Sequence, residues 1–182
     1  MLGYKGFHKG LRCMGYQYKM GLNVTEKAKA VAYGFHYAEN PLDCLSYYPD
    51  MASSEYYIVD GTGDIDEDGK DSKIACTELT ILKKLSKEEF VLHALAYMAD
   101  HPRRQRNAKV CKDKGVAGSL GFVIVYGGDP LAKGKKGDIL GFAKEDGAGN
   151  ITEVAMVAVD GTKVKAGTWY SIDLVERAVA DA

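Results

Sequence analysis

Glycine is the residue whose placement most limits how this chain folds. Twelve of its 21 glycines lie between Gly115 and Gly167. Runs rich in valine, isoleucine and aromatic residues alternate with them, and Gly-Gly-Asp-Pro, Gly-Ala-Gly-Asn and Asp-Gly turn signals separate the runs. Such short, regularly spaced runs are typical of a small antiparallel sheet. Residues 119–182 are therefore predicted to form a small glycine-rich antiparallel β-meander domain, built on LGFVIVYG, GDILGFAKED, ITEVAMVAVDG and TWYSIDL.

The part of the chain before residue 102 mixes strand and helix signals. Asn40 and Pro41 are good residues for the start of a helix that would run to about Tyr48. Ser86 and Glu89 form an S-x-x-E capping box before a second helix. Residues 1–101 are therefore predicted to form an α+β domain. Its strand candidates are Tyr4–Phe7, Met14–Tyr18, Ala30–Ala38, Tyr56–Asp60 and Lys73–Leu82, of which the last also has leucines at helical spacing.

A polar and basic stretch separates these two parts. It begins at Pro102 and is predicted to be a linker over residues 102–118. Its cations are interpreted as a solvated surface, and contact with nucleic acid or an acidic partner is the alternative. The predicted fold class is thus α+β, a mixed strand and helix domain followed by the meander. The cations are Arg103, Arg104, Arg106, Lys109, Lys112 and Lys114.

Composition excludes several classes of function. The 182 residues are 46% hydrophobic and 27% charged, which is ordinary for a globular protein, and the net charge of −1 gives no overall reason to expect nucleic acid or an anionic membrane as partner. No stretch approaches the roughly 20 apolar residues of a membrane span, and the N-terminus does not resemble a signal peptide. A soluble intracellular protein is expected. Its four cysteines form no C-x-x-C pair, so a zinc knuckle is not expected. Reduced thiols are predicted because no export signal is seen, and no cofactor is predicted.

One acidic stretch resembles a calcium-binding loop. Asp64, Asp66 and Asp68 occupy its first, third and fifth positions, and Gly69 occupies the sixth. The last position, which needs a glutamate, falls on Ala75. No metal is therefore predicted; a solvated acidic turn is favoured, and a weak cation site at the three aspartates is the alternative.

His36 is the histidine with the most distinctive setting. It lies in an aromatic strand just before the Asn40 helix start. No serine or cysteine forms a nucleophile elbow with it, and the glycine-rich stretches match neither a Walker A loop nor the dinucleotide-binding fingerprint. A histidine in such a setting is more often hydrogen-bonded in a core or pocket wall than catalytic. No catalytic residue is assigned.

Three blocks of residues resemble uncharacterised phage and prophage proteins. They are GYKGF…LRCMGYQYKMG, GFHYAENPLDCLSYY and YYIVDGTGDI…DSKIACTELTI, and they cover roughly residues 3 to 90. The tail, AKGKKGDILGFAKED…ITEVAMVAVDGTKVKAGTWYSI, is similar to the C-terminal end of many of the same proteins. The resemblance implies a phage-encoded or prophage-encoded protein in a bacterial host. It implies no activity.

The strand that contains GFH (residues 34–36) and the short helix that ends in paired tyrosines (residues 47 and 48) resemble part of the ADP-ribosyltransferase fold. In that fold, such a strand and helix line the nicotinamide pocket. It implies a pocket formed by Tyr4, Lys5, Phe35, His36 and either Tyr47 or Tyr48. The sequence departs from that pattern in three ways. Lysine stands where arginine or histidine is usual, the serine or threonine after the central strand is absent, and no Glu-x-Glu closes the set.

Two functions from different classes are therefore expected. The first is a soluble accessory protein of phage or prophage type that binds a protein partner of the host or the virion, through tyrosine-rich surface or a sheet edge. The second is an enzyme that uses NAD or a nucleotide, with its pocket at Tyr33–Tyr48. The host cytoplasm is the expected location, with the virion as the alternative. Membrane and nucleic acid are not expected partners, and a homo-oligomer is left open.

Overall fold

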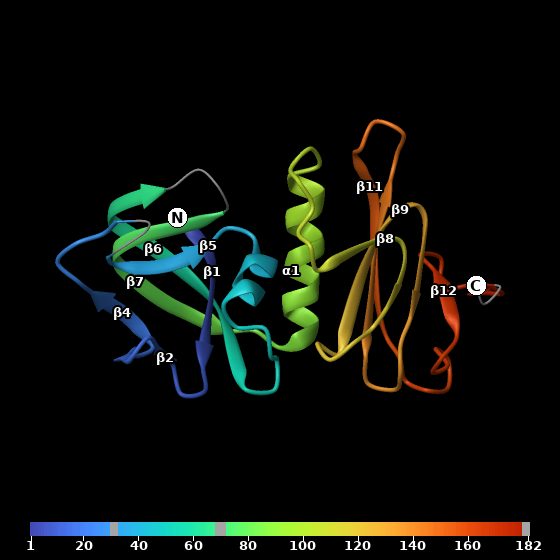
Figure 1. Ribbon diagram of the computed structural model, residues 1–182, viewed down its shortest axis with the longest axis horizontal. Coiled ribbons are helices and arrows are strands. Elements are labelled where there is room, and N and C mark those ends of the chain that lie inside the picture. The colour runs from blue at the N-terminus through green and yellow to red at the C-terminus, as the bar shows by residue number, and fades with distance from the viewer. Residues whose placement is uncertain (30–32, 68–71, 180–182) are drawn as a thin grey trace. The chain divides into compact units, whose positions relative to one another are not determined.

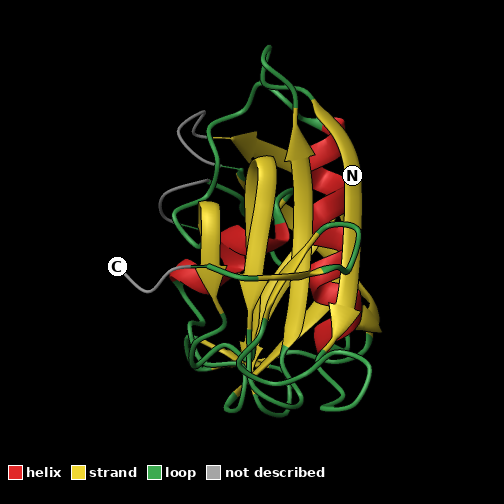
Figure 2. Cartoon of the chain, turned by 90° about the vertical axis from the view of Figure 1, so that its right-hand side faces the viewer, coloured by secondary structure: helices red, strands yellow, loops and turns green. Residues whose placement is uncertain are grey.

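The computed structural model describes residues 1–29, 33–67 and 72–179 (Figure 1). About half of the chain forms strands and 12% is helical, so the protein is β-rich (Figure 2). The predicted α+β class is therefore wrong. Helix signals are local, whereas strand length is set by partners far away in the chain; β6 and β7 extend over 14 and 12 residues. The chain divides into two compact units, Met1–Phe90 (unit 1) and Val91–Ala182 (unit 2), with the boundary inside helix α1 (Lys87–Asp100).

Four strands of unit 1 close into a ring. β1 pairs with β6, β6 with β7, β7 with β5 and β5 with β1, and every pair is antiparallel. β2 and β3 form a hairpin that continues from the end of β1, and β4 pairs with β7 at the end of the sheet. The strands are β1 (Leu2–His8), β2 (Arg12–Cys13), β3 (Tyr16–Gln17), β4 (Gly21–Val24), β5 (Phe35–Ala38), β6 (Ser54–Glu67) and β7 (Lys73–Lys84). The predicted strand Ala30–Ala38 includes residues 30–32, which lie outside the described residues.

Aromatic side chains fill the interior of this closed ring of strands. Alternate residues of a strand point to opposite faces, so Phe7 on β1 and Tyr37 on β5 point inward. Gly3 and Gly61 leave room for the aromatic ring of Tyr37, because a Cβ atom added at either position would lie within 2.6 Å of a ring carbon. The core of unit 1 consists of Phe7, Tyr18, Phe35, Tyr37, Tyr57, Val59, Ile74, Cys76, Leu79 and Ile81.

Both predicted helix starts have the expected caps. The Asn40 side chain accepts a hydrogen bond from the Leu42 N–H (3.1 Å), and the helix that follows is the short 3₁₀ helix η1 (Pro41–Ser46). At α1, the Glu89 N–H donates to the Ser86 hydroxyl (3.1 Å) and the Ser86 N–H donates to the Glu89 carboxylate (2.9 Å). The capping box is therefore confirmed.

The sheet of unit 2 is mixed. β9 pairs in parallel with both β8 and β10, and antiparallel with β12. The predicted antiparallel meander is therefore wrong: the turn signals mark where strands end, but they do not show which strands pair. β8 lies within the segment for which a linker is predicted. The strands are β8 (Val110–Val116), β9 (Phe122–Lys133), β10 (Ile139–Glu145), β11 (Ile151–Ala158), β12 (Trp169–Ser171) and β13 (Glu176–Arg177).

Candidate functional site

Lys5 lies inside the ring of unit 1 and is 6% exposed. Its ammonium group donates a hydrogen bond to the main-chain oxygen of His36, and it lies 5.4 Å from the ring centres of both Phe7 and Tyr18. Burial lowers the pKa of Lys5, and the neighbouring thiol of Cys13 opposes this shift only in part. The ring therefore holds an amine that protonates less readily than a lysine in water.

Phe35 and His36 lie on opposite faces of β5. Phe35 belongs to the core, with its ring centre 5.1 Å from that of Tyr18. The His36 side chain is half-buried, and its Nε2 lies 3.3 Å from the main-chain oxygen of Lys29. Lys5 thus meets the main chain of His36, while the imidazole has neighbours outside the ring.

The three tyrosines of the predicted pocket differ in their surroundings. Tyr48 packs over Gly6, and its ring centre lies 5.2 Å from that of His8. Burial raises the pKa values of Tyr4 and Tyr48. Tyr47 is 61% exposed. The contacts described for these residues do not join them into one cleft with His36, so the ADP-ribosyltransferase-like pocket stays a prediction.

The acidic stretch forms the end of β6. Asp64 and Asp66 are exposed there, and the Asp64 N–H donates to the Thr77 hydroxyl (2.9 Å). Asp68 lies outside the described residues. Among residues 1–29, 33–67 and 72–179, no three His, Cys, Asp or Glu side chains are grouped as a metal site would need.

β4 is one of the two terminal strands of the sheet in unit 1 (Figure 1). Its inward residue, Asn23, is 3% exposed, and its amide donates to the Lys19 oxygen (2.9 Å) and the Leu79 oxygen (3.3 Å). Its outward residues, Leu22 and Val24, are 49% and 60% exposed. The buried amide therefore holds a strand whose outer side chains are apolar.

The main-chain N–H and C=O groups of Leu22 and Val24 point to the side of β4 that is away from β7. The Thr25 N–H donates to the Thr77 oxygen (2.8 Å), which continues the ladder between β4 and β7. Main-chain groups of successive residues point in opposite directions, so those of Leu22 and Val24 point away from β7. Sequence reasoning missed this strand. The alternation of Leu22 and Val24 with Asn23 was the available signal, but it covers only four residues.

These features define a β-rich protein whose first unit combines a closed ring of strands with an open edge strand. The chain belongs to the family described as Domain of unknown function (DUF7666), whose model matches residues 1–93. That range holds all of β1 to β7. Comparison with curated proteins and with solved structures found no match. Within the described residues, no helix combines the length and apolar character that crossing a membrane requires.

Proposed function

We propose that this protein is an accessory protein of phage or prophage type that acts by binding a protein partner in the bacterial host. The observation that carries the binding function is the edge of β4 away from β7, where Leu22 and Val24 present apolar side chains and main-chain groups that point away from β7. An extended segment of the partner would add to the sheet as a further strand next to β4. The residue blocks that resemble phage and prophage proteins support the setting.

The composition of β4 supports this mode of binding. Natural proteins protect an edge strand with charged residues or proline, because an unprotected edge pairs with other chains. β4 has neither within Gly21–Val24, and Met20 beside it is 52% exposed. Main-chain hydrogen bonds to the partner would supply affinity, and its contacts with Leu22 and Val24 would supply specificity.

The test compares three proteins as bait in host lysate at micromolar concentration. The wild type is expected to recover a stoichiometric partner. The double variant Leu22→Lys/Val24→Lys is expected to bind that partner at least about tenfold more weakly, because it places two charges on the edge. Met14→Lys is the matched control, since Met14 is 96% exposed but lies outside β4. Repeated absence of any partner would contradict the function, and equal recovery by the double variant would contradict the edge.

A second copy of the chain is the other occupant that β4 would accept. Light scattering after size exclusion distinguishes the two cases. A dimer that dissociates in Leu22→Lys/Val24→Lys would identify self-association as the role of this edge. A wild-type monomer over the same concentrations agrees with a different protein as partner.

A further inference from the structure

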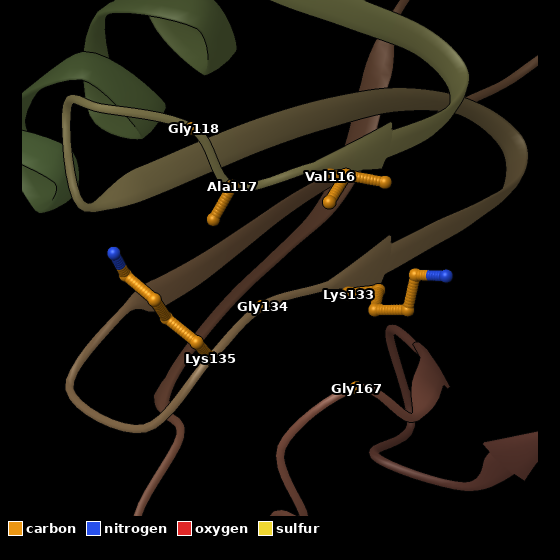
Figure 3. A pocket seen from close by; sticks show the side chains of 7 residues that line it. All are labelled: Val116, Ala117, Gly118, Lys133, Gly134, Lys135 and Gly167. Carbon is orange, nitrogen blue, oxygen red and sulfur yellow. The ribbon is translucent and has the colours of Figure 1, made fainter.

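Lys5 is the one buried lysine among the residues that the structure describes. The lysines that border a shallow hollow of unit 2 show the more usual arrangement. Figure 3 shows that the ammonium groups of Lys133 and Lys135 point away from each other there, and Lys135 is exposed. Lys5 lies inside the ring of unit 1, so the groups that reach its amine most readily are those that the fold itself places beside it.

The Cys13 thiol is a reactive group that the fold places beside this amine. β1 and β2 are antiparallel and pair His8 with Arg12. In that register the adjoining residues, Phe7 and Cys13, lie opposite each other and point to the same face. Lys5 is two residues from Phe7 on β1 and therefore shares this face. The Cys13 side chain packs against the core of unit 1 and forms a hydrogen bond with the Lys5 amine.

Cys13 is also the thiol of unit 1 that a dissolved oxidant reaches most easily. It is half-buried, whereas Cys44 and Cys76 are 5% and 0% exposed. Burial raises the pKa of Cys76 to about 11 and that of Cys44 to about 12, so both stay protonated near neutral pH. Peroxides oxidise the thiolate form of cysteine. Oxidation of unit 1 by peroxide should therefore begin at Cys13.

We propose that Cys13 and Lys5 form a covalent sulfur–nitrogen cross-link when the protein meets hydrogen peroxide. Peroxide first oxidises the Cys13 sulfur by two electrons to a sulfenic acid; the O–O bond breaks and one water is released. The Lys5 nitrogen then attacks this sulfur and the S–O bond breaks, so hydroxide leaves with a proton of the amine as a second water. One thiol, one amine and one peroxide thus give one S–N bond and two waters. The inference is independent of the proposed function of β4.

The surroundings of the amine favour the second step. An amine attacks sulfur only in its uncharged form, and burial lowers the pKa of Lys5, so more of this amine is uncharged than for a lysine in water. The hydrogen bonds to Cys13 and to the main-chain oxygen of His36 hold the nitrogen beside the sulfur. Groups held together in this way react as if one of them were present at very high concentration.

The test is peptide mapping by mass spectrometry after the full chain is treated with hydrogen peroxide. Trypsin does not cut after a modified Lys5, so the expected product is residues 1–9 joined to residues 13–19, lighter than the two peptides together by two hydrogen atoms. Met14, which is 96% exposed, should gain oxygen and so show that peroxide reached this hairpin. Dithiothreitol should release both peptides, because a thiol attacks the sulfur of the cross-link. Oxidised Met14 without the joined peptides would overturn the proposal.

The variant Lys5→Met distinguishes this cross-link from a disulfide, which has the same mass change. With dimedone present to trap sulfenic acids, Cys13 of the variant should carry the trap, because its sulfenic acid has lost the amine. Cys111, the half-buried thiol of unit 2, is the matched control and should give the same products in the wild type and the variant. A peptide pair that joins Cys13 to Cys44 or Cys76 in both proteins would overturn the proposal in favour of a disulfide.

Discussion

The two units bury different kinds of side chains, although both are built on a sheet. Unit 1 closes a ring of antiparallel strands around aromatic rings and the Lys5 amine. Unit 2 has parallel and antiparallel pairs, and its core consists of valine, leucine, isoleucine and alanine with two aromatic residues. The net charges differ too. Residues 1–90 contain 11 Lys and Arg against 14 Asp and Glu, whereas residues 91–182 contain 13 against 11.

This difference shows how closure changes what a core requires. Side chains from facing strands of a closed ring must share one small interior, so bulky rings are matched by glycines such as Gly3 and Gly61 beside Tyr37. In unit 2, Phe142 belongs to a mainly aliphatic cluster. Unit 1 should therefore respond more sharply to changes of side-chain volume and of ionisation.

The largest effect is expected from matched glycine substitutions. Gly61→Ala places a methyl group 2.5 Å from the Tyr37 hydroxyl and should destabilise unit 1 by about 3 kcal/mol. Gly141→Ala in β10 meets its nearest atoms at 3.2 Å and should change the stability of unit 2 by less than about 1 kcal/mol. Hydrogen exchange measured peptide by peptide reports each unit. Similar effects of the two changes would remove the contrast between the cores.

A smaller difference is expected from the phenylalanines. Phe7 and Phe142 are both 0% exposed, but Phe7 has edge-to-face partners in Tyr18 (5.1 Å between ring centres) and Tyr57 (5.6 Å). Phe7→Leu should therefore cost about 1–2 kcal/mol more than Phe142→Leu, because aromatic pairs contribute beyond the area that they bury. Urea denaturation of both variants measures this difference, and equal costs would show that the aromatic pairs add nothing to burial.

The pH dependence should separate the units further. Burial lowers the pKa of Lys5, so between that lowered pKa and the ordinary value of 10.5 the unfolded chain binds more protons, and the free energy of unfolding of unit 1 rises with pH there. Burial raises the pKa of Cys76 to about 11 and of Cys44 to about 12, so above about pH 9 the unfolded thiols lose protons first and stability falls. Unit 1 should be most stable near pH 9.

Lys5→Met tests this profile. It should remove the rise between the lowered pKa of Lys5 and pH 9, which is at most about 1.4 kcal/mol per pH unit, and keep the fall above pH 9. Unit 2 should stay flat between pH 7 and 9, because its shifted groups Asp146, Asp160 and Lys165 are exposed and keep one charge state there. Denaturation at several pH values measures the slopes, and an unchanged slope in Lys5→Met would assign the rise to another group.

The smallest effect is expected at His36. Its imidazole lies on the outer face of β5 and is only half-buried, so His36→Ala should change the stability of unit 1 by about 0.5 kcal/mol or less. NAD at millimolar concentration should leave the melting temperature unchanged. A rise in the wild type that is lost in His36→Ala would instead support the ADP-ribosyltransferase-like pocket.

Local signals were the part of this fold that the sequence predicts well. The caps at Asn40 and Ser86 depend on residues within three positions, and the structure contains both. The run of β-branched residues predicted as a strand at Lys73–Leu82 forms β7. These contacts need no knowledge of distant parts of the chain.

Pairing across the chain was the part that could not be predicted. The ring of unit 1 depends on matches such as Tyr4 with Ala38 and Lys5 with Tyr57, which no local pattern encodes. β8 contains Lys112, Asp113 and Lys114. These charges favoured the prediction of a linker, although the segment is a strand that pairs with β9. The candidate site also depends on pairing between distant parts of the chain. Lys5 and His36 were both singled out, but only the closure of the ring shows that the amine meets a main-chain oxygen.

The enclosed amine of Lys5 can also report how often unit 1 opens. An acylating reagent modifies neutral amines, and surface lysines will react with it at once. Lys5 has the lowered pKa that favours the reactive form, yet the closed ring keeps the reagent out. The rate at which Lys5 is acylated would therefore report local opening of the β1–β5 and β1–β6 strand pairs in otherwise native protein.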